Sequence, residues 1–190
     1  MKPTIRVPYF EVGTKNYVWG DKLLEYAIAA DKAAEKYDID VLFIVPALEV
    51  RRVAENTKNL FVLATYMDTL YPGRGCADIL PEGLKAAGAV GVMINHCEKP
   101  MSLPQMKKTI DRARELDFLV FACADTLDEA KAIALDRVPG ATDIRIYLDR
   151  DDARVIYEGT IIYNEMKYDF EIDAQSGNMI EWDAESIYDD

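Results

Sequence analysis

Val90-Gly91-Val92-Met93-Ile94-Asn95-His96-Cys97-Glu98 is the most informative segment of this chain for predicting its fold. Its apolar part, through Asn95, has the length and composition of a strand covered on both faces, as strands of parallel sheets are. It ends in an Asn-His-x-Glu run that contains the only histidine of the chain. A single histidine by itself is more often an ordinary structural residue than a functional one. The run therefore has to be interpreted from its surroundings.

Four other apolar runs of strand length flank this stretch, and helical segments alternate with them. The predicted strands are Val7–Val12, Val41–Pro46, Leu60–Thr65, Val90–Asn95 and Phe118–Ala122, each apolar enough to be covered on both faces. The predicted helices are Asp21–Tyr37, Glu49–Asn56, Pro81–Ala87 with a stop at Gly88, and two segments opened by capping-box spacing, Ser102 to about Leu116 and Thr126 to about Asp136. This alternation predicts βα units around a parallel sheet.

After Pro139-Gly140 the hydrophobic period changes to two. The predicted strands are Ile144–Leu148, Arg154–Tyr163, Met166–Ile172 and Met179–Trp182, joined by turns at Asp149–Asp152, Asn164-Glu165 and Gln175–Asn178. Apolar residues that alternate with charges are typical of half-buried antiparallel strands. The chain is therefore expected to be an α/β segment followed by an antiparallel meander.

The net charge of −12 is concentrated near the C-terminal end. Residues 1–140 carry 18 basic against 20 acidic residues, a charge of −2, whereas residues 141–190 carry 4 against 14, a charge of −10. Such an acidic segment would be repelled by nucleic acid and by anionic membranes, so we expect neither as a partner. The change in charge also predicts a boundary near residue 140.

The remaining bulk features predict a cytoplasmic protein without metal or cofactor. No apolar run reaches the roughly 18 residues of a membrane span, and Met1–Arg6 lacks the apolar core of a secretory signal. Cys76, Cys97 and Cys123 are odd in number and widely spaced. They indicate neither a disulfide framework nor a zinc site.

Several short motifs follow one another along the first half of the chain. They are Gly13-Thr14-Lys15-Asn16-Tyr17, Met67-Asp68 with Tyr71-Pro72-Gly73, Leu80-Pro81-Glu82 leading into Lys85–Ala89, and Asn95-His96-Cys97-Glu98. On these motifs, residues from about Pro8 to Ala134 resemble the N-terminal part of triosephosphate isomerase, in the divergent branch that includes tetrulose-phosphate isomerases. The resemblance implies a truncated TIM-barrel-like βα repeat with about five parallel strands.

The resemblance also implies roles for four residues. As is established for triosephosphate isomerase, a glutamate base moves the proton, a neutral histidine polarises the carbonyl and a closing loop excludes water. Lys15 would then be the cation beside the phosphate and the enediolate, and His96 the electrophile. Glu98 would be a supporting carboxylate and Asn95 an orienting amide. The alternatives are a solvated Lys15 and a Cys97 that is a small packing residue, since no second histidine can activate its thiol.

Departures from the family weaken the expectation of an enzyme. Gly13 stands where the commoner branch has asparagine, and Gly73–Ala77 lacks the threonine that usually reaches across the dimer. The strand with the glutamate base, the lid and the last two phosphate loops have no counterpart in the printed sequence. Proton abstraction needs a base within about 3 Å of the carbon, and we interpret Glu165 as a solvated turn residue. We therefore expect weak or no isomerase activity from a single chain.

The segment from Thr126 to Glu185 resembles a different family, the PepSY domain. Its clearest mark is the block from Tyr168 through Ile172-Asp173-Ala174 to Gly177. The resemblance implies a helix on an antiparallel sheet that binds or inhibits proteins and supplies no catalytic residues. Because residues 126–135 fit both families, we predict a shared junction helix at 126–136. It would connect a βα domain at 1–125 with an acidic PepSY-like domain at 137–190.

Two functions follow from these resemblances. One is a sugar-phosphate isomerase of triosephosphate type, with a small sugar phosphate as substrate. The other is a protein-binding or inhibitory module that acts through the C-terminal part. An incomplete barrel also leaves a sheet edge and apolar positions uncovered, which predicts cover by the C-terminal domain or self-association into a homo-oligomer.

Overall fold

The computed structural model describes residues 4–124, 126–151, 154–174 and 179–188. Two compact units are present in it. The first unit comprises Met1–Ile94 and Pro104–Phe121, and the second comprises Asn95–Leu103 and Ala122–Asp190. We describe each unit by itself.

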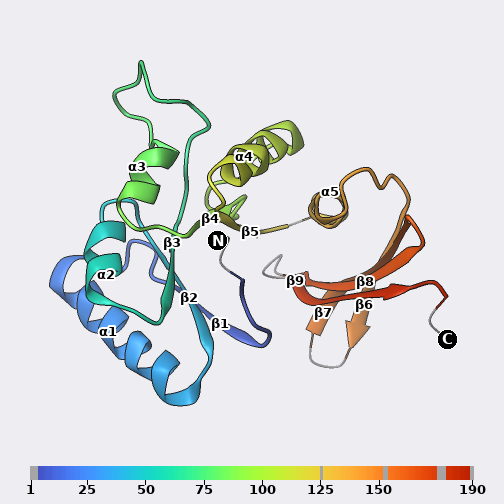
Figure 1. Cartoon of the computed structure of the whole chain (residues 1–190), viewed down its shortest axis with the longest axis horizontal. Helices are drawn as coiled ribbons and strands as arrows, with labels where there is room; N and C mark the ends of the chain where they lie inside the picture. The colour runs from blue at the N-terminus through green and yellow to red at the C-terminus, as the bar shows by residue number, and fades with distance from the viewer. Residues whose placement is uncertain (1–3, 125, 152–153, 175–178, 189–190) are drawn as a thin grey trace. The chain divides into compact units, whose positions relative to one another are not determined.

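A five-stranded parallel sheet in the order β1-β2-β3-β4-β5 forms the centre of the first part of the chain (Figure 1). Its strands are β1 (Tyr9–Gly13), β2 (Asp40–Val45), β3 (Leu60–Ala64), β4 (Gly91–Ile94) and β5 (Leu119–Ala122). The sheet order follows the chain order, which is how successive βα units build a barrel wall. The predicted α/β class and truncated barrel are therefore confirmed.

Four helices connect these strands. They are α1 (Gly20–Tyr37), α2 (Val50–Asn56), α3 (Pro81–Ala86) and α4 (Leu103–Glu115). On α1 the buried residues Leu23, Ala27 and Ala34 lie at helical spacing and form the face that packs on β2 and β3. After α3, Gly88 adopts a φ of 98°, the left-handed conformation expected for a glycine that ends a helix.

Burial differs between the central and the outer strands of this sheet. Every residue of β2 is buried, and Leu42 and Ile44 form a core with Leu63 of β3. By contrast, every residue of β5 is only half-buried, and Phe10 of β1 is 60% exposed. The prediction that all five strands are covered on both faces is therefore wrong for β1 and β5. Each of them lies at a sheet edge with a single neighbouring strand.

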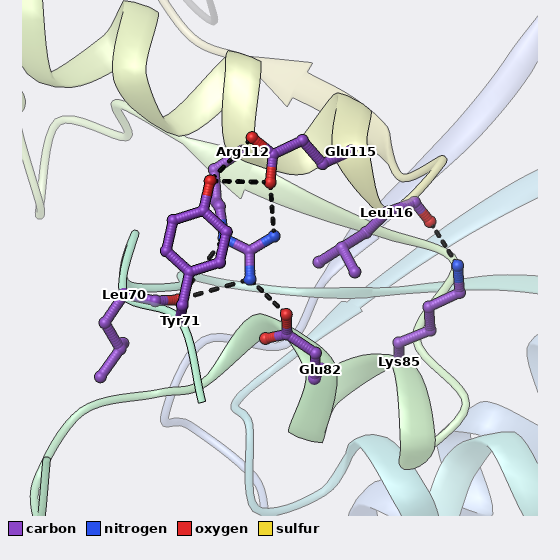
Figure 2. Close-up of polar contacts among 7 residues, drawn as sticks. All are labelled: Leu70, Tyr71, Glu82, Lys85, Arg112, Glu115 and Leu116. Atoms are coloured by element: carbon purple, nitrogen blue, oxygen red, sulfur yellow. Dashed lines mark hydrogen bonds and ion pairs between the residues drawn. The ribbon is translucent and has the colours of Figure 1, made fainter. Parts of the chain in front are cut away.

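Arg112 of α4 anchors the segment after β3 and the start of α3 (Figure 2). Its guanidinium carbon lies 4.1 Å from the centre of the Tyr71 ring, and Nε and Nη2 each donate to the Leu70 carbonyl at 3.4 Å. Nη1 pairs with Glu115 at 3.0 Å, and Nη2 pairs with Glu82. The Arg112 side chain is only 4% exposed. Several contacts therefore depend on one buried charge.

The second unit contains a four-stranded antiparallel sheet in the order β6-β7-β8-β9. Its strands are β6 (Ile144–Asp151), β7 (Arg154–Tyr163), β8 (Met166–Asp173) and β9 (Met179–Ser186). The hairpin turn predicted at Asn164-Glu165 is confirmed, with φ of 50° and 62° at its two residues. The predicted Gln175–Asn178 turn lies outside the described residues.

Two strands of this sheet are longer than predicted. Residues 149–151, expected to turn, continue β6 and pair with residues 154–156 of β7. Likewise β9 continues past Trp182 to Ser186, which pairs with Met166. In both places acidic residues lowered the expected strand tendency, but pairing with the neighbouring strand extends the ladder. Asp152, also part of the predicted turn, is outside the described residues.

Helix α5 (Leu127–Arg137) packs on β6 and β7 of this sheet (Figure 1). Its start is fixed by the predicted capping box, in which Thr126 Oγ1 accepts from Glu129 N and Glu129 Oε2 accepts from Thr126 N, each at 3.2 Å. Its end is held by Arg137, whose guanidinium lies 5.1 Å from the centre of the Trp182 ring. Buried side chains from helix and sheet form the core of this unit: Ala130, Ile133, Ala134, Ile161, Phe170 and Ile172.

Candidate functional site

Lys15 lies in a backbone turn directly after β1. The amide of the buried Thr14 donates to Ile44 O of β2 at 3.1 Å, and Tyr17 N donates to Thr14 O at 3.3 Å. Lys15 itself has a φ of 48° and is half-buried. The end of the strand and the following turn are therefore held in place by hydrogen bonds to the sheet. This position, at the carboxyl end of a parallel strand, is the one that the sequence predicts for Lys15.

Glu11, which the sequence interpretation missed, lies on β1, the strand that leads into the Lys15 turn. Its Oε1 is only 2.8 Å from the point where a Cβ on Gly13 would lie, so its carboxylate occupies the space beside that glycine. Burial raises the pKa of Glu11, and the nearby Lys15 charge partly offsets the increase. The available sequence clue was a glutamate inside an apolar strand, two residues before a glycine.

Asn95 organises the loop after β4. It has a φ of 56°, a conformation that asparagine tolerates better than most residues, and it is 2% exposed. Its Nδ2 donates to the Cys123 carbonyl at 2.9 Å, and its Oδ1 accepts from Met101 N at 2.7 Å. The amide thus joins the beginning and the end of its own loop to the residue after β5. Asn95 therefore holds the loop in place, and its role as an orienting amide in a substrate site stays a prediction.

His96 and Glu98 lie next to each other in this loop. His96 Nδ1 accepts the backbone N–H of Glu98 at 3.1 Å, and a turn is closed by Lys99 N, which donates to His96 O at 2.7 Å. An Nδ1 that accepts a hydrogen bond carries no proton, so this contact suits the tautomer with its proton on Nε2. The Glu98 carboxylate lies 3.9 Å from Nδ1, and the Cys97 sulfur lies 3.7 Å from it. The loop therefore favours an imidazole with an Nε2–H donor.

The structure thus brings together three of the four predicted site residues, Asn95, His96 and Glu98, within the second unit. Lys15 belongs to the first unit, together with Glu11. Among the described residues, no group of three or more histidine, cysteine, aspartate or glutamate side chains could hold a metal ion. No helix of the described chain is long and apolar enough to cross a membrane.

Replacing Asn95 by alanine tests its part in the loop. We expect Asn95→Ala to lower the free energy of unfolding by about 2–3 kcal/mol, because a buried N–H and a buried carbonyl lose their partner. Asn95→Gly removes the same hydrogen bonds but suits the positive φ. Urea unfolding monitored by Trp182 fluorescence would measure both variants. A change below about 0.5 kcal/mol in Asn95→Ala, within the range of a surface substitution, would contradict the role of the amide.

Similarity to known proteins separates the chain into two parts. It is 30% identical to triosephosphate isomerase of Sulfolobus acidocaldarius over 137 residues, which are 72% of this chain and 58% of the relative. It is 31% identical to triosephosphate isomerase of Methanocaldococcus jannaschii over 121 residues, 64% of this chain and 55% of the relative. The N-terminal part resembles triosephosphate isomerase. The chain spans somewhat over half the length of these curated relatives.

A solved structure supports the resemblance of the N-terminal part to triosephosphate isomerase. The crystal structure of triosephosphate isomerase from Bartonella henselae superposes with a TM-score of 0.54 at 25% identity. The superposition covers 66% of this chain and 55% of that one.

The C-terminal part matches a different family. Residues 126–183 match the family described as peptidase propeptide and YPEB domain, PepSY. The chain thus combines a triosephosphate isomerase-like half-barrel with a PepSY domain whose first matched residue, Thr126, caps α5.

Proposed function

We propose that this chain retains the two electrophilic residues of a triosephosphate isomerase-like enzyme, Lys15 in the first unit and His96 in the second. The observation that carries the proposal is the Glu98 N–H, which donates to His96 Nδ1 at 3.1 Å and so favours a ring whose proton is on Nε2. A neutral imidazole that donates to a carbonyl oxygen is the form that polarises a carbonyl in triosephosphate isomerase. The substrate class would be a small sugar phosphate, and Lys15 would supply the positive charge beside its phosphate and its enediolate.

Proton exchange measures this activity without requiring a complete isomerisation. Dihydroxyacetone phosphate would be incubated with the full chain in D2O, and loss of its carbon-bound proton signals would be followed by NMR. We expect slow exchange that falls about 100-fold or more in Lys15→Ala and in His96→Gln, since each removes stabilisation of the developing oxyanion.

The exposed Lys32 of α1 provides a matched control, because Lys32→Ala removes the same charge from a solvated helix position. We expect Lys32→Ala to keep the exchange rate of the unchanged chain. Exchange no faster than in buffer would overturn the proposal for this substrate, and so would equal rates in all three variants.

The second candidate is protein binding through the PepSY domain, and the face of its sheet opposite α5 favours it. Strand register places Glu158, Glu171 and Glu181 side by side across β7, β8 and β9. Side chains alternate along a strand, so these carboxylates lie on the opposite face to the buried Phe170. This acidic face suits a lysine- or arginine-rich segment of a partner protein.

Binding of a labelled lysine-rich peptide, measured by fluorescence anisotropy, tests this candidate. Binding should weaken at least tenfold when Glu158, Glu171 and Glu181 are changed together to glutamine. A glutamate-rich peptide of equal length is the control. Equal binding of both peptides, or no effect of the substitutions, would contradict it.

The proposed organisation keeps one helix as the junction of the two parts. We infer that the helix at 126–136 belongs to both family patterns. It would join a βα domain at 1–125 to an acidic domain at 137–190. A single capped helix over Leu127–Arg137 and the start of the PepSY match at 126 support this division. A cytoplasmic location and a homo-oligomer, both predicted from the sequence, belong to the same proposal. Size-exclusion chromatography with light scattering would test the oligomer.

A further inference from the structure

Glu11 is a partly buried carboxylate on which the charge of Lys15 acts. The proposed function assigns no role to Glu11. Side chains alternate along β1, so Glu11 and Gly13 project from the same face of the strand. Because position 13 has no side chain, the Glu11 carboxylate can bend along the strand, and its Oε1 lies 2.8 Å from the position of the missing Cβ. The absence of a side chain at Gly13 thus makes room for an acidic group near the carboxyl end of β1.

The surroundings of this carboxylate make it a stronger base than an exposed one. Glu11 pairs in register with Leu42 of β2, and Gly13 pairs with Ile44, both of which are buried. Burial is the main cause that raises the pKa of Glu11, while the positive charge of Lys15 acts in the opposite direction. No hydrogen bond from another described residue contributes to this pKa. A partly desolvated carboxylate next to a cation suits a group that accepts a proton as negative charge develops elsewhere.

We propose that Glu11 is the proton-transferring carboxylate of the Lys15 site, an assignment that rests on the proposed function. In the step, Glu11 removes a proton from the carbon beside the substrate carbonyl, and the C–H bond breaks. Its electron pair forms the C=C bond of an enediolate, whose oxyanion is stabilised by the Lys15 ammonium. The protonated Glu11 then returns a proton to carbon. In D2O the carboxylic acid exchanges its proton before the return, so deuterium enters the substrate.

The first test compares deuterium incorporation into dihydroxyacetone phosphate by the full chain and by Glu11→Gln. We expect the rate to fall about 100-fold, within the range of a lost general base. The exposed Glu35 of α1 provides a matched control, since Glu35→Gln makes the same chemical change away from Lys15. Its rate should equal that of the unchanged chain.

Rescue and stability distinguish a base from a structural residue. Added formate should restore part of the exchange in Glu11→Ala, because it supplies a small carboxylate to the vacated space, and should leave Glu11→Gln unaffected. Glu11→Gln should also unfold at the same or a higher denaturant concentration at neutral pH. A folded-state pKa that is raised makes the ionised carboxylate a cost to stability at neutral pH, and glutamine removes that cost.

The pH profile supplies another criterion. Exchange should decrease as the pH falls through the raised pKa of Glu11, because only the carboxylate accepts a proton. Lys15 is the charged group that acts on the Glu11 carboxyl, and Asp40, which Arg6 pairs at 2.7 Å, is the titratable side chain of the paired strand β2. The Asp40 carboxyl has a lowered pKa from its Arg6 hydrogen bonds, against the opposing effect of burial, so its own titration would come at lower pH.

The outcomes separate this assignment from the proposed function. Exchange that depends on Lys15 and His96 but is unchanged in Glu11→Gln would overturn the role of Glu11 and leave the proposed function standing. Exchange no faster than in buffer by the unchanged chain would overturn both for this substrate. Loss in Glu11→Gln with formate rescue of Glu11→Ala would support both.

Discussion

Arg112→Met is expected to lower the free energy of unfolding of the first unit by about 3 kcal/mol, because it removes a buried guanidinium and its charged hydrogen bonds to the half-exposed Glu82 and Glu115. The guanidinium is almost completely buried, lies against the Tyr71 ring and donates to the Leu70 carbonyl. Methionine keeps much of the side-chain volume but none of the hydrogen bonds. Hydrogen exchange of α4 amides, read by mass spectrometry along a urea series, would localise the loss to this unit.

The exposed Arg114 of the same helix is the matched control for Arg112. Its contact with Asp111 is 3.8 Å long and its side chain is 39% exposed, so Arg114→Met should change stability by less than about 0.5 kcal/mol. Equal effects of the two substitutions would show that the contacts of Arg112 are not what holds α4.

The acid side of the stability curve gives an independent check on Arg112. Its hydrogen bond to Glu82 is the main cause that lowers the pKa of that carboxyl. A lowered folded-state pKa stabilises the fold above the ordinary carboxyl range, and the contribution is lost as the pH falls through the folded-state value. The stability difference between the unchanged chain and Arg112→Met should therefore shrink below about pH 4.

Phe170→Ala is expected to destabilise the second unit by about 3–5 kcal/mol, the usual cost of removing a buried aromatic ring. Phe170 is 1% exposed, stacks on Trp182 with ring centres 6.0 Å apart, and passes over Gly159 of β7. Trp182 fluorescence during urea unfolding would report the loss. Ile162→Ala, at a position 60% exposed on the neighbouring strand, should cost less than about 1 kcal/mol.

A double-mutant cycle tests whether the ring and the glycine fit each other. A Cβ on Gly159 would overlap Phe170 Cζ and lie 2.6 Å from Arg145 O, so Gly159→Ala should cost about 1–3 kcal/mol through overpacking. In combination with Phe170→Leu, whose side chain is shorter, part of that cost should disappear. Strict additivity of the two single changes would contradict the proposed contact.

Local sequence patterns were sufficient for most elements of the fold. The helix at Leu127–Arg137 begins at the predicted capping box, and the turn at Asn164-Glu165 occurs between the two predicted strands. Both depend on interactions between residues close in sequence, which a pattern can reveal. The extensions of β6 to Asp151 and of β9 to Ser186 were missed because they depend on a partner strand rather than on the propensity of the segment.

The site was predictable to the extent that it lies within single loops. Two hydrogen bonds of Asn95-His96-Cys97-Glu98 form within its loop: Glu98 N donates to His96 Nδ1, and Met101 N donates to Asn95 Oδ1. Glu11 was not recognised, because its meaning depends on the space beside Gly13 and on the buried residues of β2. Those features exist only when the strand has paired with its neighbour.

The sequence alone was enough to predict the alternation of strands and helices, the resemblance to two families, and Lys15 and His96 as candidate site residues, because each depends on periodicity or on a short motif. The three-dimensional structure was needed to show which strands are half-exposed, which groups surround Nδ1 of His96, and where the Glu11 carboxylate lies. Burial and hydrogen-bond partners are set by residues far apart in the chain, and it is these partners that change the pKa and the role of a side chain.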